Sequence, residues 1–303
     1  MTTYDTNTPA PAPAPGSTPA PGSASESGSA PAPILVLGAT GKTGRRVVAR
    51  LRAAGRPVRA ASRTAETPFD WTDSATWGPA LEGVSAVYLV PPPRPEPIAA
   101  FVERARAAGV RRFVVLSGRG IEQYGDSFEP SMAEAERVVR AAGVDWTVIR
   151  PNNFVQNFDE DLFRAPLLAG RLALPTGHVL EPIIDVEDIA DVVAALLTED
   201  GHTGKVYELS GPRALTFADA VAEISAAAGR PMRFEAITAD AYTAELTADG
   251  VPEADARSLA DVLVWLSEGH NSSVARGVRD VLGREPRDFS EYVKSAAAAG
   301  AWS

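Results

Sequence analysis

The sequence predicts an α/β protein built on a doubly wound parallel sheet, with a smaller, mostly helical lobe toward the C-terminus. Three observations lead to this fold class. Apolar runs of four to six residues alternate with amphipathic helical stretches. A glycine-rich turn joins the first run to the first helix, and beyond residue 151 the alternation loosens into a largely helical pattern. Alternating strands and helices form right-handed βαβ units, which assemble into parallel sheets.

The expected elements follow one another closely from residue 34. The first strand, 34–37, reads Ile-Leu-Val-Leu and ends at a glycine, and the helix over 45–54 is closed by Gly55. Continuous apolar runs of this length are typical of strands that helices cover on both faces. Further strands are expected at 57–62, 86–90, 112–117, 146–149 and 205–209, with a short extended piece reaching 69–71 and further helices at 74–81, 97–108, 132–142 and 288–299.

The first 33 residues have a composition of their own. They hold eight prolines among alanine, serine, threonine and glycine, and only Asp5 and Glu26 carry side-chain charge. Such a segment buries too little apolar surface to offset the entropy lost on ordering, so we expect a disordered, partly polyproline-like tail. The body spans 34–303, with a core over about 34–150 and a lobe contributed mainly by about 151–303.

Composition and charge exclude several kinds of site. The chain has no cysteine, only three histidines far apart and a net charge of −10. Disulfides, thiolate nucleophiles and metal sites are therefore not expected, and an acidic surface disfavours direct contact with nucleic acid. No apolar run reaches the ~20 residues of a membrane span, and no signal peptide is evident. We expect a soluble, cytoplasmic protein that is a monomer or a homodimer.

A glycine-rich turn is the main motif of the sequence. Gly38, Gly41 and Gly44 are spaced G-x-x-G-x-x-G between a predicted strand and a predicted helix. Glycine allows the sharp turn and the close approach of a pyrophosphate to the helix N-terminus, so the turn predicts a dinucleotide-binding loop. Gly41-Lys-Thr43 also suggests an ATP-binding P-loop, but that motif needs a glycine five positions before Gly41, where Val36 stands.

The end of the second predicted strand indicates which dinucleotide is bound. Arg63 stands there, where an acidic residue would select NAD and an arginine accommodates the 2′-phosphate of NADP. The position therefore favours NADP(H) over NAD(H), the alternative being a solvated arginine without a ligand. Asp70 and Trp71 are expected to cover the adenine, and Val90 and Pro91 end a strand at the carboxyl edge, where ligands bind to such sheets.

Six motifs, taken together, indicate a protein family: Ile34-Leu-Val-Leu-Gly-Ala-Thr-Gly-Lys-Thr-Gly44, Phe69-Asp-Trp71, Val87-Tyr-Leu-Val-Pro91, Phe113-Val-Val-Leu-Ser117, Trp146-Thr-Val-Ile-Arg-Pro-Asn-Asn-Phe154 and Ile184-Asp-Val-Glu-Asp-Ile-Ala190. They resemble the NmrA-like group of atypical short-chain dehydrogenases/reductases, from residue 34 to the C-terminus. The first two look most like the ergot-alkaloid agroclavine/festuclavine dehydrogenase branch. The resemblance implies a Rossmann fold that binds NAD(P)(H) and a small C-terminal substrate lobe.

The resemblance also implies roles for single residues. Asn153 and Phe154 would approach the nicotinamide. Carried over position by position, the dinucleotide contacts would be Gly38, Thr40, Gly41, Lys42, Thr43, Gly44, Arg63, Asp70, Val90 and Ser117.

The proton relay of most short-chain dehydrogenases, a Tyr-x-x-x-Lys pair, is absent from this sequence. The three lysines, Lys42, Lys205 and Lys294, all lack a tyrosine four positions before them, and Tyr124 is followed at that spacing by Phe128. Ser117, at the end of its predicted strand, and Tyr124 remain as candidate catalytic residues. The alternative for Ser117 is an ordinary strand-end hydroxyl with a satisfied hydrogen bond.

Two functions remain open. The first is an NAD(P)H-dependent reductase of a small apolar electrophile, such as an imine or iminium, an enone or a quinone, which needs positioning more than proton transfer. The second is a non-catalytic sensor of NADP(H) that acts through a protein partner. Four aromatic residues of the lobe either line a substrate pocket or pack in its core, namely Phe154, Phe158, Phe163 and Trp265. Asp185 and Thr216 are expected to cap helices rather than to act in catalysis.

Overall fold

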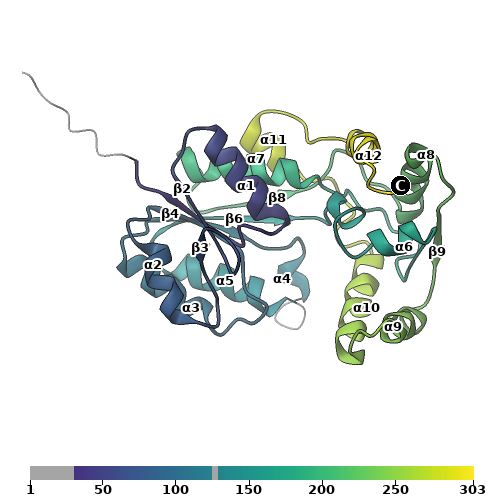
Figure 1. Cartoon of the computed structure of the whole chain (residues 1–303), viewed down its shortest axis with the longest axis horizontal. Coiled ribbons are helices and arrows are strands. Elements are labelled where there is room, and N and C mark those ends of the chain that lie inside the picture. The colour runs from purple at the N-terminus through teal and green to yellow at the C-terminus, as the bar shows by residue number, and fades with distance from the viewer. Residues whose placement is uncertain (1–30, 125–128) are drawn as a thin grey trace, which may run out of the picture. The chain divides into compact units, whose positions relative to one another are not determined.

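The computed structural model describes residues 31–124 and 129–303, and Figure 1 shows how their elements are arranged. Residues Pro31–Ser303 form one compact unit. The tail predicted over 1–33 lies outside the described residues except for its last three positions. Within the described ranges, no helix combines the length and the apolar character needed to cross a bilayer.

A seven-stranded sheet forms the centre of the molecule. Its strands are β1 (Ile34–Leu37), β2 (Val58–Ser62), β3 (Thr67–Pro68), β4 (Ala86–Leu89), β5 (Arg112–Leu116), β6 (Asp145–Pro151) and β8 (Lys205–Leu209). They lie in the order β3-β2-β1-β4-β5-β6-β8, and every neighbouring pair is parallel. The predicted doubly wound sheet is confirmed. Its strand order reverses beside β1 and β4, so the carboxyl ends of these strands frame the ligand crevice of such folds.

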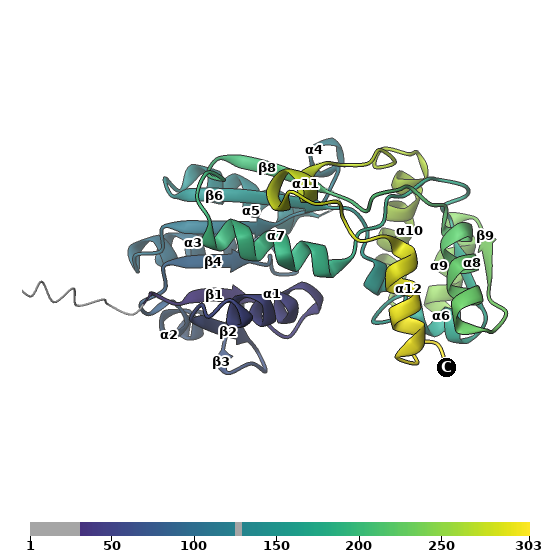
Figure 2. The same cartoon turned by 90° about the horizontal axis from the view of Figure 1, so that it is seen from above.

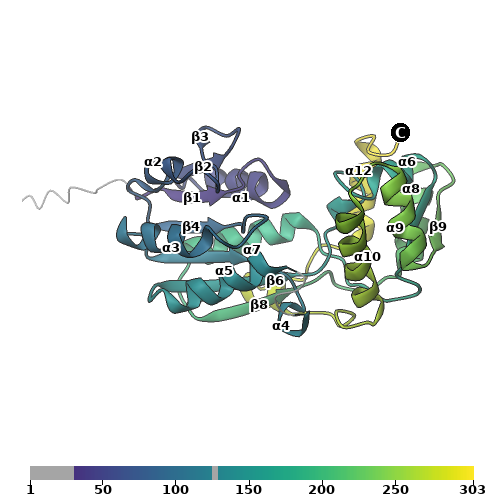
Figure 3. The same cartoon turned by 90° about the horizontal axis from the view of Figure 1, so that it is seen from below.

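Helices cover both faces of this sheet, as Figures 2 and 3 show from opposite sides. One face carries α1 (Lys42–Ala53), α7 (Val186–Thr198) and α11 (Gly277–Leu282), and the other carries α2 (Trp77–Leu81), α3 (Ile98–Ala107) and α5 (Pro130–Ala141). The apolar run of β1 follows from this layering. Ile34 and Val36 belong to the core on the α1 side, whereas Leu35 and Leu37 belong to the core on the α3 side.

A second, smaller layer forms the lobe. Its elements are α6 (Arg164–Leu168), β7 (Arg171–Leu174), α8 (Phe217–Ala228), β9 (Arg233–Ala236), α9 (Ala239–Ala248), α10 (Glu253–Ser267) and α12 (Phe289–Ala298). Strands β7 and β9 pair in parallel as a separate two-stranded sheet. Phe158 and Phe163 are buried here against Phe217 and Phe289, so these two aromatic side chains belong to the core of the lobe and not to a pocket.

Residues after 150 do not all belong to the lobe. Strand β8 pairs with β6, and helices α7 and α11 lie against the large sheet, so the lobe is assembled from separate stretches of the chain beyond residue 151. The two predicted helix caps are present, and one of them, Asp185, lies where the chain returns from the lobe to the sheet. Asp185 accepts a hydrogen bond from the Glu187 amide at the start of α7, and Thr216 with Asp219 forms a capping box at the start of α8.

The described residues also form three short helical turns, η1 (Ser74–Thr76), α4 (Ile121–Tyr124) and η3 (Val155–Asn157). The extended piece expected to reach 69–71 is shorter in the structure, because β3 ends at Pro68. Asp70 lies just beyond it in a turn, where its backbone amide donates to the Thr76 hydroxyl. Turn η3 directly follows the end of β6 and leads the chain from the sheet into the lobe.

Candidate cofactor and substrate site

The glycine turn has the geometry of a cradle for an anion. Gly38 takes a positive φ of 63°, and the Gly41 amide donates to the Gly38 carbonyl at 2.8 Å. A Cβ on Gly44 would lie 2.1 Å from that same carbonyl oxygen, so only glycine lets α1 start this close to β1. A Cβ on Gly41 would lie 3.2 Å from it. The turn is therefore as tight as the predicted pyrophosphate loop requires.

Helix α1 leaves its N-terminus open for a ligand. Gly41 is the N-cap and contributes no side-chain hydrogen bond, and the first turn holds no acidic residue. The amides of this turn and the positive end of the helix dipole thus remain available to a diphosphate. The Thr40 hydroxyl, within the turn, donates to Ser62 at 3.2 Å, and Thr43 is buried in the first turn of α1.

The expected adenine side of the crevice gathers around the ends of β2 and β4. Arg63 is exposed there. The pKa of Asp70 is lowered mainly because its carboxylate accepts hydrogen bonds from the Thr72 amide and hydroxyl, and the charge of Arg63 lowers it further. Trp71 packs edge-on against Phe101. Trp71 also borders a hollow of about 600 Å³ lined in addition by Trp77 and Pro92.

Val90 and Pro91 follow β4 and close the other side of the glycine turn. A Cβ placed on Gly38 would meet the Val90 side chain at 3.5 Å, which is an ordinary packing distance. Val90 therefore lies against the loop that the sequence assigns to the dinucleotide, and Pro91 follows it in the chain.

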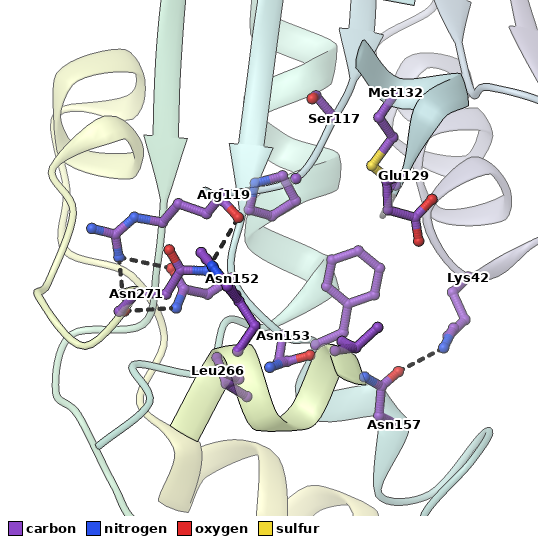
Figure 4. A pocket seen from close by; sticks show the side chains of 15 residues that line it. Lys42, Ser117, Arg119, Glu129, Met132, Asn152, Asn153, Asn157, Leu266 and Asn271 are labelled. Carbon is purple, nitrogen blue, oxygen red and sulfur yellow. Dashed lines mark hydrogen bonds between the residues drawn. The ribbon is translucent and has the colours of Figure 1, made fainter. Parts of the chain in front are cut away.

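A cavity of about 250 Å³ lies beyond the glycine turn, between the carboxyl ends of β5 and β6 and helix α10 of the lobe (Figure 4). The sheet contributes Ser117 and the stretch 151–154, which includes the predicted nicotinamide contacts Asn153 and Phe154. The lobe contributes apolar side chains. The complete lining is Lys42, Ser117, Gly118, Arg119, Glu129, Met132, Pro151, Asn152, Asn153, Phe154, Asn157, Val262, Trp265, Leu266 and Asn271.

The hydrogen bond that Ser117 donates prevents it from acting as a free acid. Its hydroxyl is buried and donates to Glu136 Oε1 at 2.6 Å. Glu136 in turn accepts from the Arg150 guanidinium at 2.9 and 2.7 Å, and from Arg140 at 2.7 Å. With its proton committed to Glu136, Ser117 offers the cavity a hydrogen-bond acceptor. Tyr124 ends α4, and its side chain lies outside the described part of the chain, so a catalytic role for it stays a prediction.

The floor of the cavity is a buried polar network that the sequence did not reveal. Arg119 donates to Asn152 Oδ1 at 2.9 Å and to the carbonyl of Ser273, and Asn271 donates to the Arg119 carbonyl at 3.1 Å. Asn152 donates to Glu181 Oε1. The partners are up to 154 residues apart. Arg150-Pro-Asn-Asn153 marked the sheet half of this floor, but no local pattern pointed to Glu181 or Asn271.

Glu181 predicts a pH-dependent stability. Burial, only partly opposed by the hydrogen bond from Asn152, raises the pKa of this 1 % exposed carboxyl from an ordinary 4.5 to about 7. The unfolded chain therefore releases this proton at lower pH than the folded chain does, and stability falls as pH rises from about 4.5 to 7. Glu181→Gln cannot ionise. Relative to wild type, the variant should gain about 2 to 3 kcal/mol between pH 5 and pH 8 in urea unfolding.

Glu208→Gln is the matched control, because Glu208 accepts from Arg119 at the same network but is 47 % exposed. Its stability difference from wild type should change little over this pH range. An equal pH dependence in both variants would contradict the assignment to Glu181.

Lys42 enters the cavity from the side opposite the Arg119 network, as Figure 4 shows. Its ammonium donates to Asn157 Oδ1 at 2.7 Å and to Asp161 Oδ2 at 2.6 Å, and it lies 5.8 Å from the centroid of the Phe154 ring. Its backbone, by contrast, forms the first residue of α1 at the glycine turn. The ammonium of Lys42 therefore faces the cavity, and its backbone faces the glycine turn.

Comparison with known proteins places this geometry in a family. The family described as NAD(P)H-binding matches residues 38–200, from the first glycine of the turn to the end of α7. The chain belongs to this NAD(P)H-binding family. The matched range includes the glycine turn, and the predicted nicotinamide cofactor is confirmed at the level of NAD(P)H.

Two relatives and one solved structure illustrate the similarity. The NAD(P)H azoreductase of Xenophilus azovorans is 34% identical over 88% of this chain and 98% of its own length. The (4-alkanoyl-5-oxo-2,5-dihydrofuran-3-yl)methyl phosphate reductase of Streptomyces griseus is 36% identical over 86% and 96%. The triphenylmethane reductase of Citrobacter sp., solved with NADP(H), has a TM-score of 0.75 at 23% identity over 87% and 99%, which shows the shared fold.

The predicted resemblance to the NmrA-like atypical short-chain dehydrogenases/reductases is confirmed. Agroclavine dehydrogenase of Claviceps fusiformis is 30% identical over 86% of this chain and 96% of its own length. NmrA itself, a negative transcriptional regulator solved with NADP, shares the fold with a TM-score of 0.70 at 15% identity, over 90% of this chain and 97% of its own.

Proposed function

We propose that this chain is a reductase that uses NAD(P)H, with NADPH preferred, to reduce a small apolar electrophile without a Tyr-x-x-x-Lys relay. The observation that carries the proposal is the position of the 250 Å³ cavity, which begins where the glycine turn ends and is closed by apolar residues of α10. Relatives named as an NAD(P)H azoreductase, a (4-alkanoyl-5-oxo-2,5-dihydrofuran-3-yl)methyl phosphate reductase and an agroclavine dehydrogenase support reductase chemistry here.

The residues present fit a dinucleotide. The open N-terminus of α1 and the tight glycine turn would hold the diphosphate, Arg63 the 2′-phosphate, and Asn153 and Phe154 the nicotinamide. NAD(P)H, when bound, supplies a hydride to the electrophile.

The chain's own contribution is mainly positioning. Val262, Trp265 and Leu266 of α10 form an apolar wall of the cavity, against which an apolar electrophile can pack. Ser117 accepts a hydrogen bond from whatever donor enters, because its own proton goes to Glu136. A proton needed after reduction would come from water or from Tyr124. Conjugated acceptors suit such a site, because their reduction depends on orientation more than on a strong acid.

The direct test is anaerobic oxidation of NADPH against a panel of quinones, enones and cyclic imines. We expect turnover of at least one class, with initial rates proportional to enzyme concentration. Tight NADPH binding without turnover of any class would reject the reductase and favour the NADP(H) sensor.

Arg63 is expected to set the preference between the two dinucleotides. Arg63→Ala should weaken NADPH binding about 10- to 100-fold, because one or more hydrogen bonds to a charged phosphate are lost, and should change NADH binding less than threefold. Arg56→Ala is the matched control, since Arg56 is also exposed but lies before β2, at the opposite end of that strand. Fluorescence titration of both cofactors measures the effect. Equal affinities of wild type for NADPH and NADH would disprove this role.

A further inference from the structure

The ammonium of Lys42 is held in the cavity rather than at the cofactor loop. Asn157 and Asp161 both belong to the segment that leads from the sheet into the lobe, more than 110 residues away in sequence. The lysine side chain is 24 % exposed, and it lies over the face of Phe154, one of the predicted nicotinamide contacts. A pyrophosphate at the helix N-terminus would be bound by the backbone of this turn, which leaves the side chain for another task.

Lys42 is also the charge best placed to act on a bound molecule. Arg119, the other basic residue of the lining, already donates to Glu208, Asn152 and Ser273. Of the three hydrogens on the Lys42 ammonium, the bonds to Asn157 and Asp161 use two. Glu129 is the one acidic residue of the lining, and desolvation raises the pKa of its carboxyl. The cavity thus presents the Lys42 ammonium to its contents.

The partner carboxylate offsets part of this charge. Asp161 is 58 % exposed, so water screens it, whereas the ammonium faces the partly enclosed cavity. Asp161 and Asn157 act as positioning residues that keep the lysine extended across Phe154. Replacing Lys42 with an uncharged residue of similar size would keep the volume of the cavity and remove the positive charge of the ammonium.

We propose that Lys42 contacts the carbonyl oxygen of a neutral α,β-unsaturated ketone or a related neutral acceptor and stabilises the negative charge that forms there. This inference rests on the proposed reductase function and narrows its substrate class. As the β-carbon of the acceptor gains a hydride, the electron pair of the C=C bond moves toward the carbonyl oxygen and gives an enolate. A proton from water then adds to the α-carbon, so the C=C bond is reduced to a single bond.

The arrangement discriminates between classes of electrophile. An oxyanion next to a fixed ammonium is stabilised strongly where water is scarce, and losing one such group typically costs 10²- to 10³-fold in kcat. A preformed cation such as an iminium develops no negative charge, because the hydride neutralises it. Lys42 therefore offers nothing to an iminium and repels it. Lys42 thus supplies a positive charge to the site, as the lysine of the absent Tyr-x-x-x-Lys pair would, but from the opposite wall.

The test compares two small acceptors, neutral 2-cyclohexen-1-one and cationic N-methyl-3,4-dihydroisoquinolinium, with NADPH as reductant. Lys42→Met should lower kcat for the enone about 100-fold and leave kcat for the iminium unchanged or raised. NADPH affinity, measured by fluorescence titration, should stay within about threefold. Arg45→Met is the matched control, because Arg45 also joins α1 to the lobe, through Glu160, without lining the cavity.

Three outcomes would overturn the proposal. An equal loss on both acceptors, with weakened NADPH binding, would make Lys42 a cofactor contact. An undiminished enone rate in Lys42→Met would remove any role in charge stabilisation. Wild-type turnover of the iminium but not the enone would reject the inference while the reductase function stands, whereas no turnover by the wild type of any acceptor in the wider panel would reject both.

Discussion

Replacing Gly41 with valine is expected to abolish binding of NADPH and NADH while the protein stays folded. Gly41 has φ −77° and ψ 177°, an extended conformation that any residue adopts, so the backbone tolerates the change. The added side chain would meet the Gly38 carbonyl at 3.2 Å and occupy the mouth of the anion cradle. Losing two or more hydrogen bonds to a charged diphosphate corresponds to a loss of affinity of about 100-fold or more.

Calorimetric titration with both cofactors, alongside the thermal midpoint, measures this effect. Gly44→Ala is an informative companion, because its Cβ would lie 2.1 Å from a backbone oxygen and must displace α1 from β1. That variant should lose stability as well as binding. A folded Gly41→Val variant with wild-type affinity would show that the cofactor does not use this turn.

Replacing Glu136 with leucine is expected to be the most destabilising single change in the core of the site, by about 3 to 5 kcal/mol in urea unfolding. Glu136 and Arg150 are each 6 % exposed, and Glu136 also accepts from Ser117 and Arg140. Without it, the buried guanidinium would keep, among the residues that the structure describes, only the bond to Glu122, which lies at the surface. An uncompensated buried charge is the physical cause of the loss.

Two further variants separate this cause from a general loss of charge on α5. Glu134→Leu removes an ion pair with Arg137 on the same helix, where the arginine is 68 % exposed, and should cost less than about 1 kcal/mol. The double variant Glu136→Leu/Arg150→Met removes both buried charges and should recover most of the stability. Equal losses in Glu136→Leu and Glu134→Leu would mean that burial does not decide the outcome.

Local patterns in the sequence predicted the parts of the site that short-range rules control. The glycine turn joins a strand and a helix that are neighbours in the chain, and its spacing depends on the close approach of Gly44 to Gly38. The alternation of strands and helices predicted the parallel sheet, because each βαβ unit has only one favourable hand. Ser117 was a candidate because it ends a predicted strand at the carboxyl edge of the sheet, whereas Asn153 was implied by the family resemblance.

The hydrogen-bond partners of individual side chains could not be predicted in this way. Ser117 follows its strand as expected, but its proton goes to Glu136 on α5, which only packing of the helix against the sheet brings within 2.6 Å. No motif pointed to the roles of Glu181 and Asn271 in this network, because those roles depend on contacts over 29 and 152 residues. Strand β8 was expected from its sequence, but its place next to β6 depends on the return of the chain through α7.

The sequence alone therefore determined the fold class, the glycine turn and the absence of a Tyr-x-x-x-Lys pair, because each depends on residues a few positions apart. Tertiary structure decided which side chains reach the cavity. It placed the Lys42 ammonium 2.6 Å from Asp161, inside a cavity whose opposite wall comes from the lobe. The direction of a long side chain depends on partners far away in the chain, and those partners are set only when the lobe packs against the sheet.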